Sequence, residues 1–198
     1  MTIRQQRVLL DQPTRPWLDP EKLKDSYHQK TLKAHPDTQT SRPGPDATST
    51  PFASLNEAYQ VLQDPKRRLH HLLNLKGAAP SSTDQTVPSP LHDLFPAVGM
   101  LSQRANHLQE EIQAASNALS RSLLKPQILE VQSQAREVRA RIQELFDVSL
   151  AELRRIDAAW GTNPTEQIEA LSNLYSAFAY LTRWSAQVDE LMFQLSLH

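Results

Sequence analysis

The chain of 198 residues contains no cysteine. Disulfides, thiol catalysis, cysteine-based zinc sites and iron–sulfur ligation by this chain are therefore excluded. Glycine is scarce, at 4 residues, whereas proline is comparatively frequent, at 14. Sheet proteins need glycine for hairpins and bulges, and helical proteins use proline to begin and end helices. The balance favours an all-α fold.

Long apolar runs and a large charge of one sign are missing as well. No stretch approaches the roughly 18 apolar residues of a membrane span, and residues 8–10 are too short for a signal peptide. We therefore expect a cytoplasmic protein without a membrane partner. The net charge is −1, so no basic field attracts nucleic acid, and we expect no such partner. The segment MTIRQQRVLL predicts a short first helix, with an organellar presequence as the alternative.

Two segments rich in proline, serine, threonine and glycine interrupt the chain, at 38–51 and 77–90. Neither shows apolar periodicity, so both are predicted to be loops or linkers. We expect a first domain over residues 1–77, a linker over 78–90 and a second domain over 91–198.

Helix signals in the first domain are local. Asp19-Pro20-Glu21 combines an N-cap, a first-turn proline and an acid that suits the positive helix end. This helix is predicted to end near Ala34, because Pro36 disfavours helical geometry at the residue before it. A second helix is predicted over about 52–63, and Pro65 opens a third that stops at Gly77.

Beyond the linker, apolar residues recur at steps of three and four in three runs, 94–119, 128–156 and 168–195. This heptad-like stripe predicts three long helices whose apolar faces form a core. Pro126 lies near the start of the second run, and Asn163-Pro164 begins the third. The short connection at Gly161 predicts that the last two helices are antiparallel.

The tripeptide His35-Pro36-Asp37 lies between the first two predicted helices of the first domain. Its context, LKDSYHQKTLKAHPD before and FASLNEAYQVLQDPKRR after, closely resembles the J-domain, a module that docks on DnaK-type chaperone ATPases. The resemblance covers residues 8–77. It implies an antiparallel helical hairpin that holds the HPD loop at its tip, where the tripeptide stimulates ATP hydrolysis by the chaperone. A plain turn is the alternative.

In J-domains, residues of the helix before the tripeptide also contact the chaperone. The matching candidates are Lys24, Tyr27, His28, Lys30 and Lys33, with a solvated face as the alternative for the lysines. Because ATP hydrolysis would occur on the partner, we expect an activator rather than an enzyme, without a cofactor.

After Asp64-Pro65 the chain reads KRRLHHLLNLKG. The leucine pair and the Leu-x-Gly ending resemble the HscB-type co-chaperones of iron–sulfur cluster biogenesis. That resemblance implies a C-terminal helical domain whose apolar surface holds an IscU-type scaffold protein. The family also has glutamates where this chain has Gly99, Ser102 and Asn106. The candidate scaffold-binding residues that match the family are Leu94, Phe95, Val98, Met100 and Tyr180.

Phe95 and Tyr180 lie beside the apolar stripes rather than on them, which is typical of interface aromatics. Packing between the two domains is the alternative. His70-His71 has no third ligand at metal spacing, so no metal site is expected. The three tryptophans are interpreted as core or domain-junction residues, and the protein as a monomer or weakly self-associating.

Two other functions stay open from the sequence. One is a J-domain co-chaperone that serves a different client. The other is a structural helical adaptor whose J-module is inactive.

Overall fold

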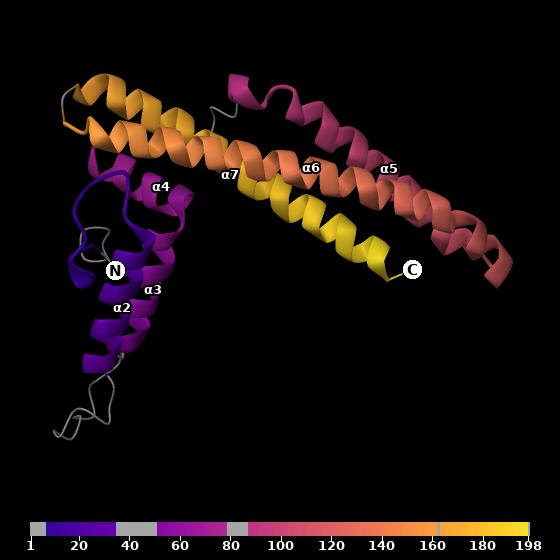
Figure 1. The fold of residues 1–198 in the computed structure, drawn as a ribbon, viewed down its shortest axis with the longest axis horizontal. Helices are drawn as coiled ribbons and strands as arrows, with labels where there is room; N and C mark the ends of the chain where they lie inside the picture. The colour runs from indigo at the N-terminus through magenta and orange to yellow at the C-terminus, as the bar shows by residue number, and fades with distance from the viewer. Residues whose placement is uncertain (1–6, 35–50, 79–86, 162, 198) are drawn as a thin grey trace. The chain divides into compact units, whose positions relative to one another are not determined.

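The computed structural model describes residues 7–34, 51–78, 87–161 and 163–197. Regular structure in these ranges is helical, with no strand, which confirms the all-α prediction. Residues 7–9 are helical, in agreement with a short first helix. The further elements are α2 (Pro20–Ala34), α3 (Pro51–Gln63), α4 (Pro65–Leu75), η2 (Ser89–Leu91), α5 (Leu94–Ala114), α6 (Ala118–Ala158) and α7 (Pro164–Ser196) (Figure 1).

The chain forms two compact units. Unit 1 combines Met1–Asp84 with Glu152–Tyr175, and unit 2 combines Gln85–Ala151 with Ser176–His198. The end of α6 and the beginning of α7 therefore belong to unit 1, together with the N-terminal helices. None of the described helices has both the length and the apolar character that crossing a bilayer requires.

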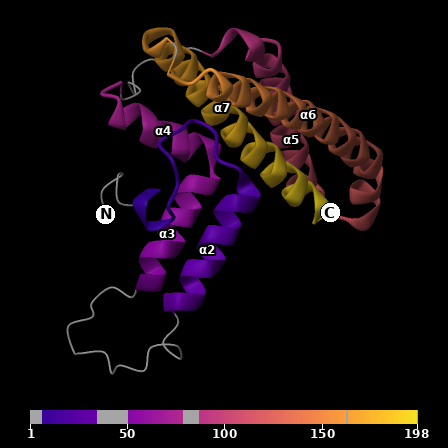
Figure 2. The ribbon, with the colours of Figure 1, turned by 60° about the vertical axis from the view of Figure 1, so that its left-hand side comes forward.

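In unit 1, α2 and α3 lie side by side as a hairpin (Figures 1 and 2). The predicted cap is present, because Asp19 Oδ1 accepts a hydrogen bond of 3.0 Å from the backbone N–H of Glu21. Asp64 caps α4 in the same way, through Arg67 N–H at 3.0 Å. Apolar side chains from both helices and the preceding segment bury one another; the buried members are Leu10, Leu18, Leu23, Leu55, Ala58 and Leu62.

In unit 2, α5, α6 and α7 form an up-down-up bundle. Arg139 pairs with Asp189, while Gln132 donates to the carbonyl of Leu195, so α7 runs antiparallel to α6 as predicted. The apolar stripes meet in one core; its buried members include Leu91, Leu94, Leu101, Leu108, Ile112, Ile128, Ile142, Leu181, Trp184, Leu191 and Leu195.

Helix boundaries differ from the periodic pattern at the α5–α6 connection. The first stripe was predicted to continue to residue 119, but α5 ends at Ala114 and α6 begins at Ala118. Asn117 Oδ1 accepts the backbone N–H of Ser120 at 2.8 Å, so a local cap begins the new helix here. Leu119 is consequently 73% exposed rather than in the core. Pro126 lies inside α6 rather than near its beginning.

Candidate functional site

The predicted tripeptide His35-Pro36-Asp37 lies outside the described residues. The two helices on either side of it in the sequence are described, since α2 ends at Ala34 and α3 begins at Pro51. These helices form the hairpin that the J-domain resemblance implies. The rings of Tyr27 and Tyr59 stack with their centroids 4.4 Å apart, so the two helices are in direct contact at this point.

The candidate chaperone-binding residues on α2 have different environments. Lys24, His28 and Lys33 are exposed, and Lys24 and His28 are one helical turn apart, so they lie on the same side of α2. Tyr27 is half-buried by its stacking against α3. Lys30 forms an ion pair within the chain, in which its Nζ lies 2.7 Å from Asp11 Oδ2. The structure therefore groups Lys24 with His28 and pairs Lys30 with Asp11.

Unit 1 contains a polar connection that the sequence patterns did not reveal. Asp157, at the end of α6, forms a 3.0 Å ion pair with Arg15 and accepts the backbone N–H of Trp17 at 3.2 Å. The Trp17 ring lies against Arg154, whose Cζ is 4.3 Å from the ring centroid. A further cation, Lys76 Nζ, lies 5.7 Å from the Trp160 centroid. These contacts attach the segment before α2 and the end of α4 to the long helices.

Two buried arginines occupy the same unit. Arg68 donates from Nε to the carbonyl of Pro16 at 3.1 Å and from Nη1 to the carbonyl of Leu62 at 2.8 Å. Burial lowers its pKa to about 10, although the charges of Asp64 and Asp157 act in the opposite direction. Arg7 also has its pKa lowered to about 10, first by burial and then by the charge of Arg68. Both guanidinium groups stay charged at neutral pH.

In unit 2, Phe95 and Tyr180 come together on Trp184. The ring centroids of Phe95 and Trp184 are 6.2 Å apart, and those of Tyr180 and Trp184 are 5.3 Å apart. Phe95 is 56% exposed, whereas Trp184 is buried in the core. Arg183 lies over the Tyr180 ring, with its Cζ 4.8 Å from the centroid. We call Phe95, Tyr180 and Trp184 the aromatic cluster; it joins α5 to α7.

The other candidate scaffold-binding residues lie apart from this cluster or beneath it. Leu94 and Val98 are buried in the core of unit 2, so they support Phe95 from below and do not form the surface. Met100 is 65% exposed, but it follows Phe95 by five residues and therefore lies about 140° away from it around α5. Ser102 Oγ accepts a 2.7 Å hydrogen bond from Gln187 Nε2, which connects α5 with α7 beside the cluster.

Within the described ranges, no group of three candidate metal ligands gathers at the histidine pair. The ring of His70 lies near Tyr175, with centroids 5.7 Å apart, and its Nδ1 is 3.2 Å from the side-chain nitrogen of Asn74. His71 is buried on α4. His71 therefore belongs to the packing of unit 1, whereas His70 is exposed beside Tyr175.

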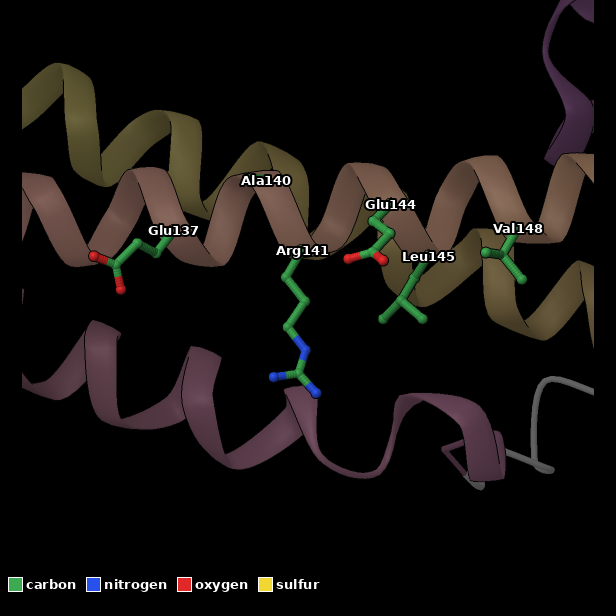
Figure 3. A pocket seen from close by; sticks show the side chains of 6 residues that line it. All are labelled: Glu137, Ala140, Arg141, Glu144, Leu145 and Val148. Atoms are coloured by element: carbon green, nitrogen blue, oxygen red, sulfur yellow. The ribbon is translucent and has the colours of Figure 1, made fainter.

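A hollow of about 540 Å³ lies along α6 in unit 2. Figure 3 shows Arg141 projecting between the acidic side chains of Glu137 and Glu144, with Leu145 and Val148 farther along the helix. None of the candidate chaperone-binding or scaffold-binding residues lines this hollow.

Residues 14–71 match the family described as the DnaJ domain. The DnaJ homolog subfamily A member 1 homolog of Dictyostelium discoideum is 42% identical over 48 residues, which are 24% of this chain and 10% of that protein. The co-chaperone protein HscB homolog of Aeromonas salmonicida is 35% identical over 72 residues, 35% of this chain and 42% of that protein. The matched segments thus span less than half of either relative.

The solved structure of chaperone HscB from Vibrio cholerae resembles this chain over nearly its whole length. It aligns with 98% of this chain and 99% of the other, with a TM-score of 0.56 and 18% sequence identity. At that identity the likeness is one of fold. It extends well past the DnaJ domain and includes the helices of unit 2.

Proposed function

We propose that the chain is a co-chaperone of the HscB type that stimulates the ATPase of a DnaK- or HscA-type chaperone, because it contains a DnaJ domain match and its fold resembles that of chaperone HscB. We propose further that it delivers an IscU-type scaffold protein to that chaperone. The single observation that carries the first part is the DnaJ domain match over residues 14–71 together with the HPD tripeptide inside it.

The chaperone-binding role rests on the α2–α3 hairpin. Its stacked tyrosines and apolar core hold the two helices on either side of the HPD tripeptide together. A preorganised hairpin loses less conformational entropy when it docks than a mobile one. The exposed side chains of Lys24 and His28 offer cationic and polar contacts, and Lys24 favours the approach of an acidic patch on the ATPase.

Charge reversal tests this role. Lys24→Glu should lower the chaperone's stimulated ATPase rate at sub-saturating protein, and the difference should shrink as salt screens the charges. Lys125→Glu is the matched control, because it changes the net charge equally on an exposed residue of unit 2 that does not belong to the hairpin. Equal rates for the two variants would contradict docking through α2.

The scaffold-binding role rests on the aromatic cluster. Phe95 presents more than half of its surface to solvent while its ring is held against Trp184. A fixed, exposed aromatic side chain supplies contact area at little entropic cost, as interface hot spots do. The positions beside it that carry glutamates in HscB-type proteins are small or amide residues here, so contact with the scaffold would depend on the apolar side chains.

A binding titration with an IscU-type scaffold tests this second role. Phe95→Ala should weaken binding by about 2 kcal/mol, as the loss of an interface anchor does, which is roughly 30-fold. Phe193→Ala is the matched control, because Phe193 is another exposed phenylalanine of unit 2, at 60% exposure, outside the cluster. No binding by the unaltered chain would favour a co-chaperone with a different client. Equal losses of affinity in both variants would contradict binding through the aromatic cluster.

A further inference from the structure

Unit 1 contains a pocket whose wall includes a buried cation. The pocket has a volume of about 290 Å³ and lies where α2, α3 and α4 converge. Its volume is near the lower end of the range of ligand pockets, about 300–1,000 Å³, and therefore suits a small ligand. The residues that line it are Leu18, Pro20, Leu23, Tyr59, Gln63 and Arg68.

Arg68 is only 3% exposed, and all its hydrogen bonds to the described residues go to backbone carbonyls. Its Nε and Nη1 are used in this way, which leaves Nη2 without a hydrogen-bond partner in the described ranges. The Trp17 ring lies 5.7 Å from its Cζ and offers a weak cation–π contact. A buried guanidinium is normally paired with a carboxylate. The charges of Asp64 and Asp157 act on Arg68, but neither carboxylate forms an ion pair with it, and no other ion pair with Arg68 occurs among the described residues.

A second buried guanidinium increases the positive charge inside unit 1. Arg7 is 2% exposed, and its Nε and Nη2 have no hydrogen-bond partner in the described part of the chain. Its charge opposes that of Arg68, as the lowered pKa of Arg7 reflects. An anion beside Arg68 would offset this repulsion and supply the missing acceptor.

The remaining walls of the pocket set the shape of the ligand. Leu18 and Leu23 are buried apolar side chains, and they line a space that a short aliphatic chain would fill. We propose that this pocket binds a small carboxylate with a short branched apolar chain, its carboxylate on Arg68 and its chain against Leu18 and Leu23. The same chemistry occurs in a free branched-chain acid and in the C-terminal leucine of a polypeptide. Binding in this pocket requires neither the chaperone nor the scaffold as a partner.

A titration of the full chain followed by ¹H–¹⁵N NMR tests the site. Sodium isovalerate should produce saturable shifts of the Arg68 side-chain Nε–H and of the backbone amides of Leu18 and Leu23. Isovaleramide, which has the same shape without the charge, should produce none. No saturable shift with isovalerate, or equal binding of the amide, would overturn the proposal.

A pair of glutamine variants tests the place of binding. Gln63→Glu adds a negative charge to the pocket wall at an exposed residue and should weaken isovalerate binding about threefold or more. Gln60→Glu adds the same charge one turn away, outside the lining residues, and should change binding much less. Equal effects of the two variants would place the ligand elsewhere and overturn the proposal.

A peptide that ends in a free leucine carboxylate distinguishes the two sources of the ligand. Binding about tenfold tighter than isovalerate, and lost on amidation of the peptide, assigns the pocket to the C-terminus of a polypeptide. Isovalerate binding that the peptide does not match assigns the pocket to a free acid. Either result supports a carboxylate site, and failure of both ligands to bind contradicts it.

Discussion

Asp157 is the residue whose loss should most clearly weaken unit 1 without touching its apolar core. Its side chain is 13% exposed, pairs with Arg15 at 3.0 Å and accepts the backbone N–H of Trp17 at 3.2 Å. Hydrogen bonds to charged groups contribute about 1.5–3 kcal/mol each, and the half-exposed Arg15 makes its share smaller. Asp157→Ala should therefore lower the free energy of opening of unit 1 by about 2 kcal/mol.

Hydrogen–deuterium exchange by mass spectrometry measures this effect in each unit separately. About 2 kcal/mol corresponds to roughly 30-fold faster exchange for amides that exchange through the opening of unit 1. Peptides from α5 in unit 2 should exchange as in the unaltered protein. In Asp157→Asn, exchange in unit 1 should be faster than in the unaltered protein and slower than in Asp157→Ala, because asparagine keeps a hydrogen-bond acceptor and loses the charge.

Asp189→Ala is the matched control. Asp189 also pairs with an arginine, at 2.9 Å from Arg139 Nε, but both side chains are substantially exposed, at 49% and 31%. Exposed ion pairs contribute about 0.2–1 kcal/mol, so this variant should accelerate exchange only a few-fold. The reasoning would be refuted if Asp157→Ala destabilised unit 1 no more than Asp189→Ala destabilises unit 2.

Four further variants test the packing, the turns and the charges. Leu62→Ala should lower the free energy of unfolding of unit 1 by about 2–5 kcal/mol in urea titrations, because Leu62 is fully buried; a loss below 1 kcal/mol would contradict its core position. Gly99→Ala should raise the melting temperature, since α5 leaves space for the methyl group and alanine is favoured over glycine by about 0.5–1 kcal/mol in a helix. Gly161→Ala should lower the melting temperature, because the φ of +96° at this position disfavours alanine. The opposite order of the two melting temperatures would refute both assignments. A hydrogen bond from Arg155 holds the pKa of Glu152 below its usual value. The small stabilisation from this pair should therefore be complete above the pKa of Glu152 in the unfolded chain and disappear as the pH falls through its pKa in the folded chain. Acid unfolding of Glu152→Gln, followed by stability against pH, should lack that loss.

The helices could be predicted because their packing requires a repeated spacing of apolar residues. The buried residues Leu101, Leu108 and Ile142 were all on the predicted stripes, and a cap at Asp19 is a local signal within three residues. The same repeated spacing wrongly predicts a core position for Leu119, which is exposed. A stripe can continue across a helix break when the connection happens to preserve its period, and only the cap at Asn117 reveals the break.

The division into units could not be predicted from periodicity. Leu153 and Ile142 lie on one stripe of one helix and both are buried, yet Leu153 belongs to unit 1 and Ile142 to unit 2. A stripe shows that a helix face is covered without showing which partner covers each turn.

The residues of the candidate sites were predictable to different degrees. Phe95 and Tyr180 stood out as aromatics beside the stripes, but their shared contact with Trp184 depends on the register of α5 against α7. The pair of Arg15 and Asp157 carried no sequence signal, because polar contacts between residues 142 positions apart follow no period.

Steady-state ATP turnover by a DnaK- or HscA-type chaperone tests the central claim most directly. The protein would be added with and without an IscU-type scaffold, alongside its His35→Gln variant. We expect stimulation that increases synergistically with the scaffold and is lost in the variant. Stimulation that the scaffold does not alter would contradict the proposal that the scaffold is the client. No stimulation by the unaltered chain, or equal stimulation by His35→Gln, would contradict the co-chaperone function itself.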